Sequence, residues 1–133
     1  MNLLAIKQRV MFQTNNDADD LGDFLPHVTD YINDGYDKAA MAYAGEHVTM
    51  DSDTYIPLSN DKSTPDLPDW LHMAIADWAT WLIYRNGSAP KQSRGYQFRD
   101  SAESLFSMAK NMTAAEKGLA PKTTGKYITN IPR

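Results

Sequence analysis

The 133-residue chain contains no cysteine. That absence excludes a disulfide scaffold, a thiolate nucleophile and any zinc site built with sulfur. The sequence also lacks an apolar run of the roughly 18 residues that a membrane-spanning helix needs. The first twelve residues carry Lys7 and Arg9 inside their apolar pattern, whereas a signal peptide places its charge before an uninterrupted apolar stretch. We therefore expect an ordinary first helix at this position.

Motifs that mark catalytic and metal sites are missing as well. The sequence contains no dinucleotide-binding glycine fingerprint, no P-loop and no nucleophile-elbow serine. The three histidines, His27, His47 and His72, do not form the paired pattern of a metalloprotease helix. The aspartates at 17–20 lack the glycine and the closing glutamate of an EF-hand, and Asp51-Ser52-Asp53 has the pattern of a turn. We expect no enzymatic activity, no cofactor and no metal ion.

The composition is that of an ordinary globular domain, with 42% apolar and 23% charged residues. A chain of this length forms one domain and buries roughly two-thirds of its unfolded surface. The net charge of -4 divides unevenly along the chain. Residues 1–70 hold 13 acids and 4 bases, whereas residues 71–133 hold 4 acids and 9 bases. A chain with unlike halves can attract a second copy of itself.

Apolar spacing and capping signals predict a mainly α, four-helix bundle-like domain over residues 1–118, with helices at about 2–13, 24–44, 68–86 and 90–117. Gly35 falls on the apolar face of the second helix, where we expect the close approach of another helix. The third helix is apolar nearly all round, which is typical of a central helix or of one that shares a face with a partner subunit. A C-terminal arm is expected over 119–133.

Between the second and third helices the apolar spacing changes from helical to alternating. Two short β-prone stretches flank Asp51-Ser52-Asp53, and this pattern predicts a small β-hairpin or extended arm at about 47–58. Pro57 would confine its strand to an edge.

The start of the fourth helix combines bases with aromatic residues. Lys91, Arg94 and Arg99 interleave with Tyr96 and Phe98, a pattern that can bind a nucleic-acid backbone and stack bases. The same residues are also consistent with a helix whose aromatics enter the core and whose bases meet the acidic surface of a neighbouring copy. A small helical nucleic-acid-binding protein of a phage or prophage, with a packaging or regulatory role, is therefore the alternative function.

Three stretches of sequence resemble the head-tail connector (adaptor, or head-completion) proteins of tailed bacteriophages. They are the tryptophan-rich block at 78–87, the basic-aromatic block at 91–99 and the ending Tyr127-Ile128-Thr129-Asn130-Ile131-Pro132-Arg133. The resemblance spans most of the chain and is weakest over 46–66. It implies a non-enzymatic structural protein of the virion neck, made in the host cytoplasm, that assembles as a ring under the portal protein. Such a ring, commonly a dodecamer, extends the DNA channel and offers a platform to the tail or stopper protein.

The resemblance and the charge pattern together suggest how copies would meet. A ring uses heterologous contacts, in which one face meets a different face of the next copy. The expected electrostatic contact joins acids of the second helix to bases of the fourth, namely Asp30, Asp34 and Asp37 with Lys91, Arg94 and Arg99. Exposed apolar area on the third helix would supply affinity. The expected arm residues that contact the portal or a neighbour are Tyr127, Ile128, Asn130, Ile131 and Arg133, and DNA would pass without sequence-specific binding.

Overall fold

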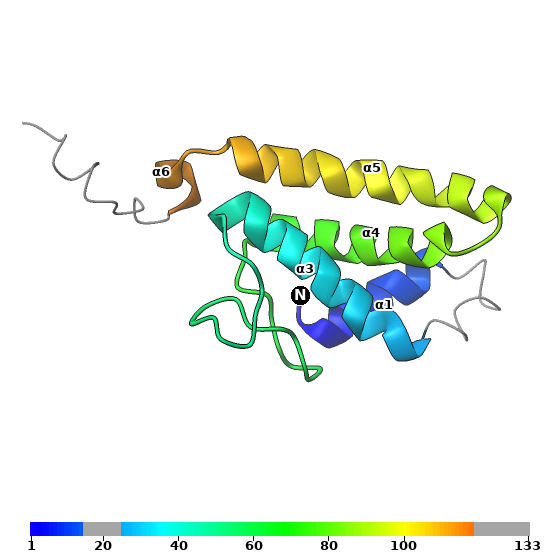
Figure 1. Ribbon diagram of the computed structural model, residues 1–133, viewed down its shortest axis with the longest axis horizontal. Coiled ribbons are helices and arrows are strands. Elements are labelled where there is room, and N and C mark those ends of the chain that lie inside the picture. The colour runs from blue at the N-terminus through cyan, green and yellow to red at the C-terminus, as the bar shows by residue number, and fades with distance from the viewer. Residues whose placement is uncertain (15–24, 119–133) are drawn as a thin grey trace, which may run out of the picture.

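Helices dominate the computed structural model, which describes residues 1–14 and 25–118 (Figure 1). In chain order they are α1 (Leu3–Gln13), the 3-10 turn η2 (Leu25–His27), α3 (Val28–Ala44), α4 (Asp69–Arg85), α5 (Ala89–Asn111) and α6 (Ala114–Lys117). The predicted mainly α, bundle-like fold is confirmed. Within the described ranges there is no β-strand, and no helix is long and apolar enough to cross a membrane.

Helix α4 is the centre of the domain. It packs against α1, α3 and α5, and all of its residues from Ala74 to Tyr84 are buried (Figure 1). This confirms a central helix as the interpretation of the apolar run. Because these side chains are buried inside the subunit, Met73 is the only large apolar residue of α4 that is strongly exposed. The expectation that this helix offers apolar area to a partner is therefore wrong.

Two glycines allow the helices to approach α4 closely. A Cβ atom at Gly35 of α3 would lie 2.9 Å from the carbonyl oxygen of Ile75, so the predicted close approach is confirmed. At Gly95 of α5, a Cβ would lie 2.6 Å from Tyr84 Cβ and 2.8 Å from Trp81 Cε3. All three distances are too short for van der Waals contact, which for two carbon atoms is about 3.5–4.0 Å. The α3–α4 and α4–α5 spacings therefore depend on a missing side chain.

The β-hairpin expected at about 47–58 does not form. The segment is an extended loop in which one backbone hydrogen bond, from Thr49 N–H to Tyr55 O, joins the two sides. Side chains of α3 take the place of a partner strand. The Asn33 amide both donates to Leu58 O and accepts from Leu58 N–H, at 2.9 and 2.7 Å, and Asp37 accepts from the N–H of Val48 at 2.9 Å. The loop is thus held mainly by side chains of α3, with few backbone hydrogen bonds of its own.

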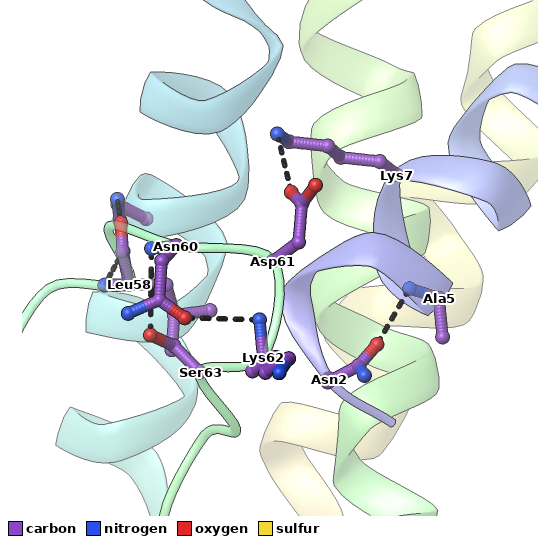
Figure 2. Close-up of polar contacts among 9 residues, drawn as sticks. Asn2, Ala5, Lys7, Leu58, Asn60, Asp61, Lys62 and Ser63 are labelled. Atoms are coloured by element: carbon purple, nitrogen blue, oxygen red, sulfur yellow. Dashed lines mark hydrogen bonds and ion pairs between the residues drawn. The ribbon is translucent and has the colours of Figure 1, made fainter.

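Residues 61–63, which follow this segment in the connection between α3 and α4, contact the start of α1 (Figure 2). Asn2 caps α1 by accepting from Ala5 N–H, and the Leu3 N–H donates to Ser63 O at 2.7 Å. Lys7 lies 3.1 Å from the carboxylate of Asp61 in an exposed ion pair. These contacts satisfy backbone donors that a helix start otherwise leaves unpaired. They also fix which side of α1 faces α4.

Two helix boundaries differ from the sequence prediction. The helix expected from about residue 24 begins as η2, and regular α-helix starts at Val28. The helix expected over 90–117 is two helices, because Thr113 starts α6 with a capping box. In that box Thr113 Oγ1 accepts from Glu116 N–H, and Thr113 N–H donates to the Glu116 carboxylate. The hydrogen bonds from Thr113 hold the pKa of Glu116 below its ordinary value.

Candidate functional site

A groove runs along α3; its second wall is α4 over the first half and α5 over the second half. We call it the α3–α5 groove. It consists of two adjoining hollows of about 570 and 490 Å³ that share Lys38. The first is lined by Asp30, Tyr31, Asp34, Lys38, Trp78, Leu82 and Arg85, and the second by Asp37, Lys38, Met41, Ala42, His47, Phe106 and Lys110.

Trp78 organises the middle of this groove. Its indole Nε1 donates to Asp34 Oδ2 at 2.7 Å, and Lys38 Nζ lies 4.7 Å from its ring centroid. Phe106 of α5 meets the same indole edge-on, with ring centroids 6.1 Å apart. One tryptophan therefore joins α3, α4 and α5 through a hydrogen bond, a cation–π contact and an aromatic pair.

The structure brings the three predicted acids together along this groove. Asp30 and Asp34 line its first half and Asp37 its second half. Asp34 accepts from Trp78, and Asp37 accepts from Val48 N–H and lies 3.0 Å from His47 Nδ1. Two of the three acids thus have structural partners inside the subunit.

The predicted bases lie apart from these acids, in the first half of α5. Arg99 covers the rings of Tyr96 and Trp81, with Cζ 4.6 and 5.5 Å from their centroids, and pairs with Asp100 at 3.0 Å. Arg94 is exposed and Lys91 is half-buried at the start of the helix, and neither lines the groove. Within one subunit, the predicted acids and bases therefore do not meet.

The aromatics of this basic segment are mostly turned toward the bundle. Phe98 is half-buried and stacks on Tyr84, with centroids 6.0 Å apart and planes 7° from parallel. Tyr96 packs on buried Trp81 at 5.4 Å and is 42% exposed. The described part of α5 therefore presents one exposed aromatic ring and not a row of stacking platforms.

The solvent-facing side of α1 is a second surface, flanked by the half-buried bases Lys7 and Arg9. Leu4, Gln8, Met11 and Phe12 follow one another at helical spacing, and all four are exposed. Leu4 is 42% exposed, Met11 43% and Phe12 81%. We call these four residues the α1 ridge. Apolar spacing predicts a helix here but does not show that Leu3, Ile6 and Val10 are buried while Leu4 and Met11 are exposed.

The buried polar groups hold helices together. Asp77 of α4 is 5% exposed and accepts from Gln13 Nε2 at 2.6 Å and from Ser101 Oγ at 3.0 Å. The hydroxyl of Thr80 lies 2.5 Å from Gln13 Oε1 and 3.0 Å from the Ala76 carbonyl, and its single proton is donated to one or the other. This network bridges α1, α4 and α5, and each of its groups is satisfied by a neighbour. No side chain in it is left available to attack or to bind a substrate.

The histidines also have structural surroundings. Both ring nitrogens of buried His72 are occupied, with Nε2 2.8 Å from Leu67 O and Nδ1 2.9 Å from the Met1 nitrogen. Burial lowers the pKa of His72, so the neutral ring is favoured. His27 and His47 are exposed. Across residues 1–14 and 25–118, no three metal-ligating side chains gather into a site.

Several expected residues lie outside the described ranges. They are the acidic run at 17–20 and the arm residues Tyr127, Ile128, Asn130, Ile131 and Arg133. Comparisons with protein-family models, with curated proteins and with solved structures gave no match for this chain.

Proposed function

We propose that this chain is a structural subunit of a tailed-bacteriophage neck. In this proposal it is a head-tail connector that forms a ring under the portal protein, extends the DNA channel and carries the platform for tail attachment. The resemblance of the blocks at 78–87, 91–99 and 127–133 supports the connector assignment. The structural observation that carries the proposal is the α1 ridge, a helix face that leaves large apolar side chains in water.

The ridge favours an assembly role because apolar side chains at helical spacing form a continuous strip that another protein can cover. Phe12 is the clearest case, since 81% of it is exposed while its neighbours Val10 and Thr14 are fully buried. The core of the subunit is consistent with this role, because the polar groups around Asp77 are engaged in holding the helices.

Binding to a portal ring tests the proposal. Light scattering would measure the mass of the purified chain alone, and again after mixing with a candidate portal ring. A stoichiometric complex with the portal is the expected result. A chain that ignores the portal and instead binds duplex DNA, with affinity falling steeply as salt is added, would replace this proposal with the nucleic-acid alternative.

A shortened chain tests the role of the expected arm. Removal of residues 120–133 deletes no residue of a described helix, so the shortened chain should keep the helical circular dichroism and cooperative unfolding of a folded subunit. The shortened chain should no longer join portal complexes if Tyr127, Ile128, Asn130, Ile131 and Arg133 supply the contact. Unimpaired joining would remove the arm from the proposal.

A further inference from the structure

The end of the described chain is anchored to the C-terminal end of α3. The Tyr43 hydroxyl donates to Lys117 O at 2.5 Å, and Lys117 Nζ lies 5.6 Å from the centroid of the Tyr43 ring. Figure 1 shows α6 at the same end of the bundle as the loop that joins α3 to α4. The chain beyond Gly118 therefore continues from a point beside this loop.

Two adjoining hollows open on this loop, and they share Thr54. The first has a volume of about 280 Å³ and is lined by Tyr43, Thr54, Tyr55, Asp66, Leu67 and Pro68. The second has a volume of about 520 Å³ and is lined by Glu46, His47, Thr49, Asp51, Ser52, Asp53 and Thr54. We call them the tyrosine hollow and the acidic hollow. Because Tyr43 lines the tyrosine hollow and also holds Lys117, the chain leaves α6 at the rim of that hollow.

Tyr55 gives the tyrosine hollow an unused hydrogen-bond donor. Only 3% of this residue is exposed, yet its hydroxyl makes no hydrogen bond with any residue that the structure describes. Burial and the carboxylates of Asp66 and Glu46 raise the pKa of Tyr55 to about 12, so the hydroxyl keeps its proton. Buried donors in proteins are normally paired, and a backbone carbonyl of an extended segment is a suitable acceptor.

The carboxylates around the two hollows lack cations. Glu46, Asp51, Asp53 and Asp66 are exposed, and none of them has an ion-pair partner among the described residues. The imidazole of His47, which also lines the acidic hollow, lies 3.0 Å from Asp37. Residues 119–133 carry the opposite charge, with three bases and no acid, namely Lys122, Lys126 and Arg133. Opposite charges direct such a segment toward the hollows, although each exposed ion pair is weak.

Residues 119–126 have the length and the order of side chains to cover both hollows. Eight extended residues span roughly 26 Å, at about 3.3 Å each. Leu119, Ala120 and Pro121 come first, where the chain is nearest the tyrosine hollow, and the two lysines follow. A segment tethered this closely has an effective concentration in the millimolar range, which a second copy in dilute solution does not reach. The occupant favoured by this arrangement is the subunit's own segment.

We propose that residues 119–126 dock across the two hollows of their own subunit, with the apolar start over the tyrosine hollow and the two lysines facing the acidic hollow. In this position a backbone carbonyl of the segment accepts a hydrogen bond from Tyr55. The contact goes beyond the proposed function, because it requires neither a portal nor a second copy. It also fixes the point from which residues 127–133 leave the subunit.

The absence of native cysteine allows a direct test by crosslinking. Thr54 is exposed and lines both hollows, and Thr123 lies between the two lysines of the segment. The Thr54→Cys, Thr123→Cys chain therefore has a thiol on each side of the contact, and every apolar and charged residue is kept. A short bis-maleimide should join the two thiols within one chain, which mass spectrometry would detect as a monomer carrying one linker. Linkage only between copies would overturn the proposal.

A matched control separates docking from random collision. Met108 is 54% exposed near the end of α5 and lines neither hollow, so the Met108→Cys, Thr123→Cys chain offers the segment an accessible thiol without a docking site. Docking should make the linkage to position 54 about tenfold faster, or more, than the linkage to position 108. Equal rates for the two double variants would refute docking.

Charge reversal tests the ionic part of the contact. In the chain with thiols at 54 and 123, Lys122→Glu with Lys126→Glu should slow the linkage severalfold at low salt, and so should Asp51→Lys with Asp53→Lys. All four substitutions together restore opposite charges, so the rate should recover. Salt at about 1 M, where the Debye length is about 3 Å, should remove these differences. Failure of the combined variant to recover would contradict the proposed pairing.

Hydrogen exchange of the full chain supplies a measurement without added thiols. In the Lys122→Glu, Lys126→Glu chain, backbone amides of residues 46–55 should exchange faster than in the wild type, because the segment no longer covers them. The amides of α1 should exchange at the wild-type rate, which shows that the fold is intact. Unchanged exchange over residues 46–55 would count against the docked segment.

The outcomes distinguish this inference from the proposed function, because no portal is present in these experiments. A chain that joins the portal but links position 123 equally fast to 54 and 108 would preserve the connector proposal and refute docking. A chain that links 54 to 123 within one copy but ignores the portal would preserve docking and refute the connector proposal.

Discussion

Replacement of Gly95 by alanine should destabilise the protein even though alanine is the better helix former. Within an exposed helix the change would gain about 1 kcal/mol in helix propensity. At Gly95, however, the new methyl group would lie 2.6 Å from Tyr84 Cβ and 2.8 Å from Trp81 Cε3. Restoring ordinary contact distances requires α5 to move about 1 Å away from α4.

The two neighbours cannot easily move aside. Tyr84 is 5% exposed and stacks on Phe98, and Trp81 is 7% exposed and packs on Tyr96. Overpacking costs about 1–3 kcal/mol, and two contacts under 3.0 Å against buried side chains place this site in the upper part of that range, about 2–3 kcal/mol. After the propensity gain of about 1 kcal/mol is subtracted, the net loss in the free energy of unfolding should be about 1–2 kcal/mol. For a chain of this length that corresponds to a fall in Tm of about 3–8 °C.

Urea and thermal unfolding followed by circular dichroism would measure the effect. Ser107→Ala is the matched control, because Ser107 is exposed on the same helix and its replacement changes propensity without adding a contact. The control should unfold at the wild-type midpoint or slightly above it. A Gly95→Ala protein as stable as the wild type would refute the argument that close helix approach requires glycine here.

Three further outcomes are expected. Asp77→Ala should lower the free energy of unfolding by about 1–3 kcal/mol, because the donors of Gln13 and Ser101 lose their shared acceptor. The midpoint of urea unfolding measures this loss, and an unchanged midpoint would contradict it. Because the pKa of buried His72 is lowered, the unfolded chain binds a proton that the folded chain does not, so stability should fall as pH drops below about 6.5. Urea unfolding at pH 7.5 and 5.5 would measure this, and the free energy of unfolding of His72→Gln should change less between the two pH values than that of the wild type. Thr113→Ala should speed amide hydrogen exchange in α6 while it changes global stability by less than about 1 kcal/mol, since that helix is short and exposed.

The helix positions followed from apolar spacing because that signal is local. Residues 70–84 are apolar on nearly every side, and a helix of that kind is stable only when other helices surround it. The position of Gly35 within an apolar stripe likewise indicated a close neighbour. Even the break between α5 and α6 has a local signal, the Thr113-x-x-Glu116 capping box, which the longer apolar pattern of residues 90–117 obscured.

The loop at 45–68 shows where local signals fail. Its alternating residues have strand propensity, but a strand also needs partners for its backbone. Here Asn33 and Asp37, more than ten residues earlier in the chain, take those hydrogen bonds. Strand propensity describes how a residue fits a pleated surface, and it does not specify which groups will satisfy the backbone.

By itself, the sequence determined the helical class, the central place of the apolar helix and the lack of a recognisable catalytic constellation, because each depends on residue type and short-range spacing. Tertiary structure decided which surfaces stay exposed. The apolar faces of α4 are buried inside the subunit, whereas the ridge around Phe12 is exposed to water. Asp34 and Asp37 accept hydrogen bonds from groups of the same subunit. The α3–α5 groove needs side chains from three helices, so no single segment of sequence contains it. Burial is a property of the packed whole, and that is why the exposed apolar residues could be identified only after the helices were placed.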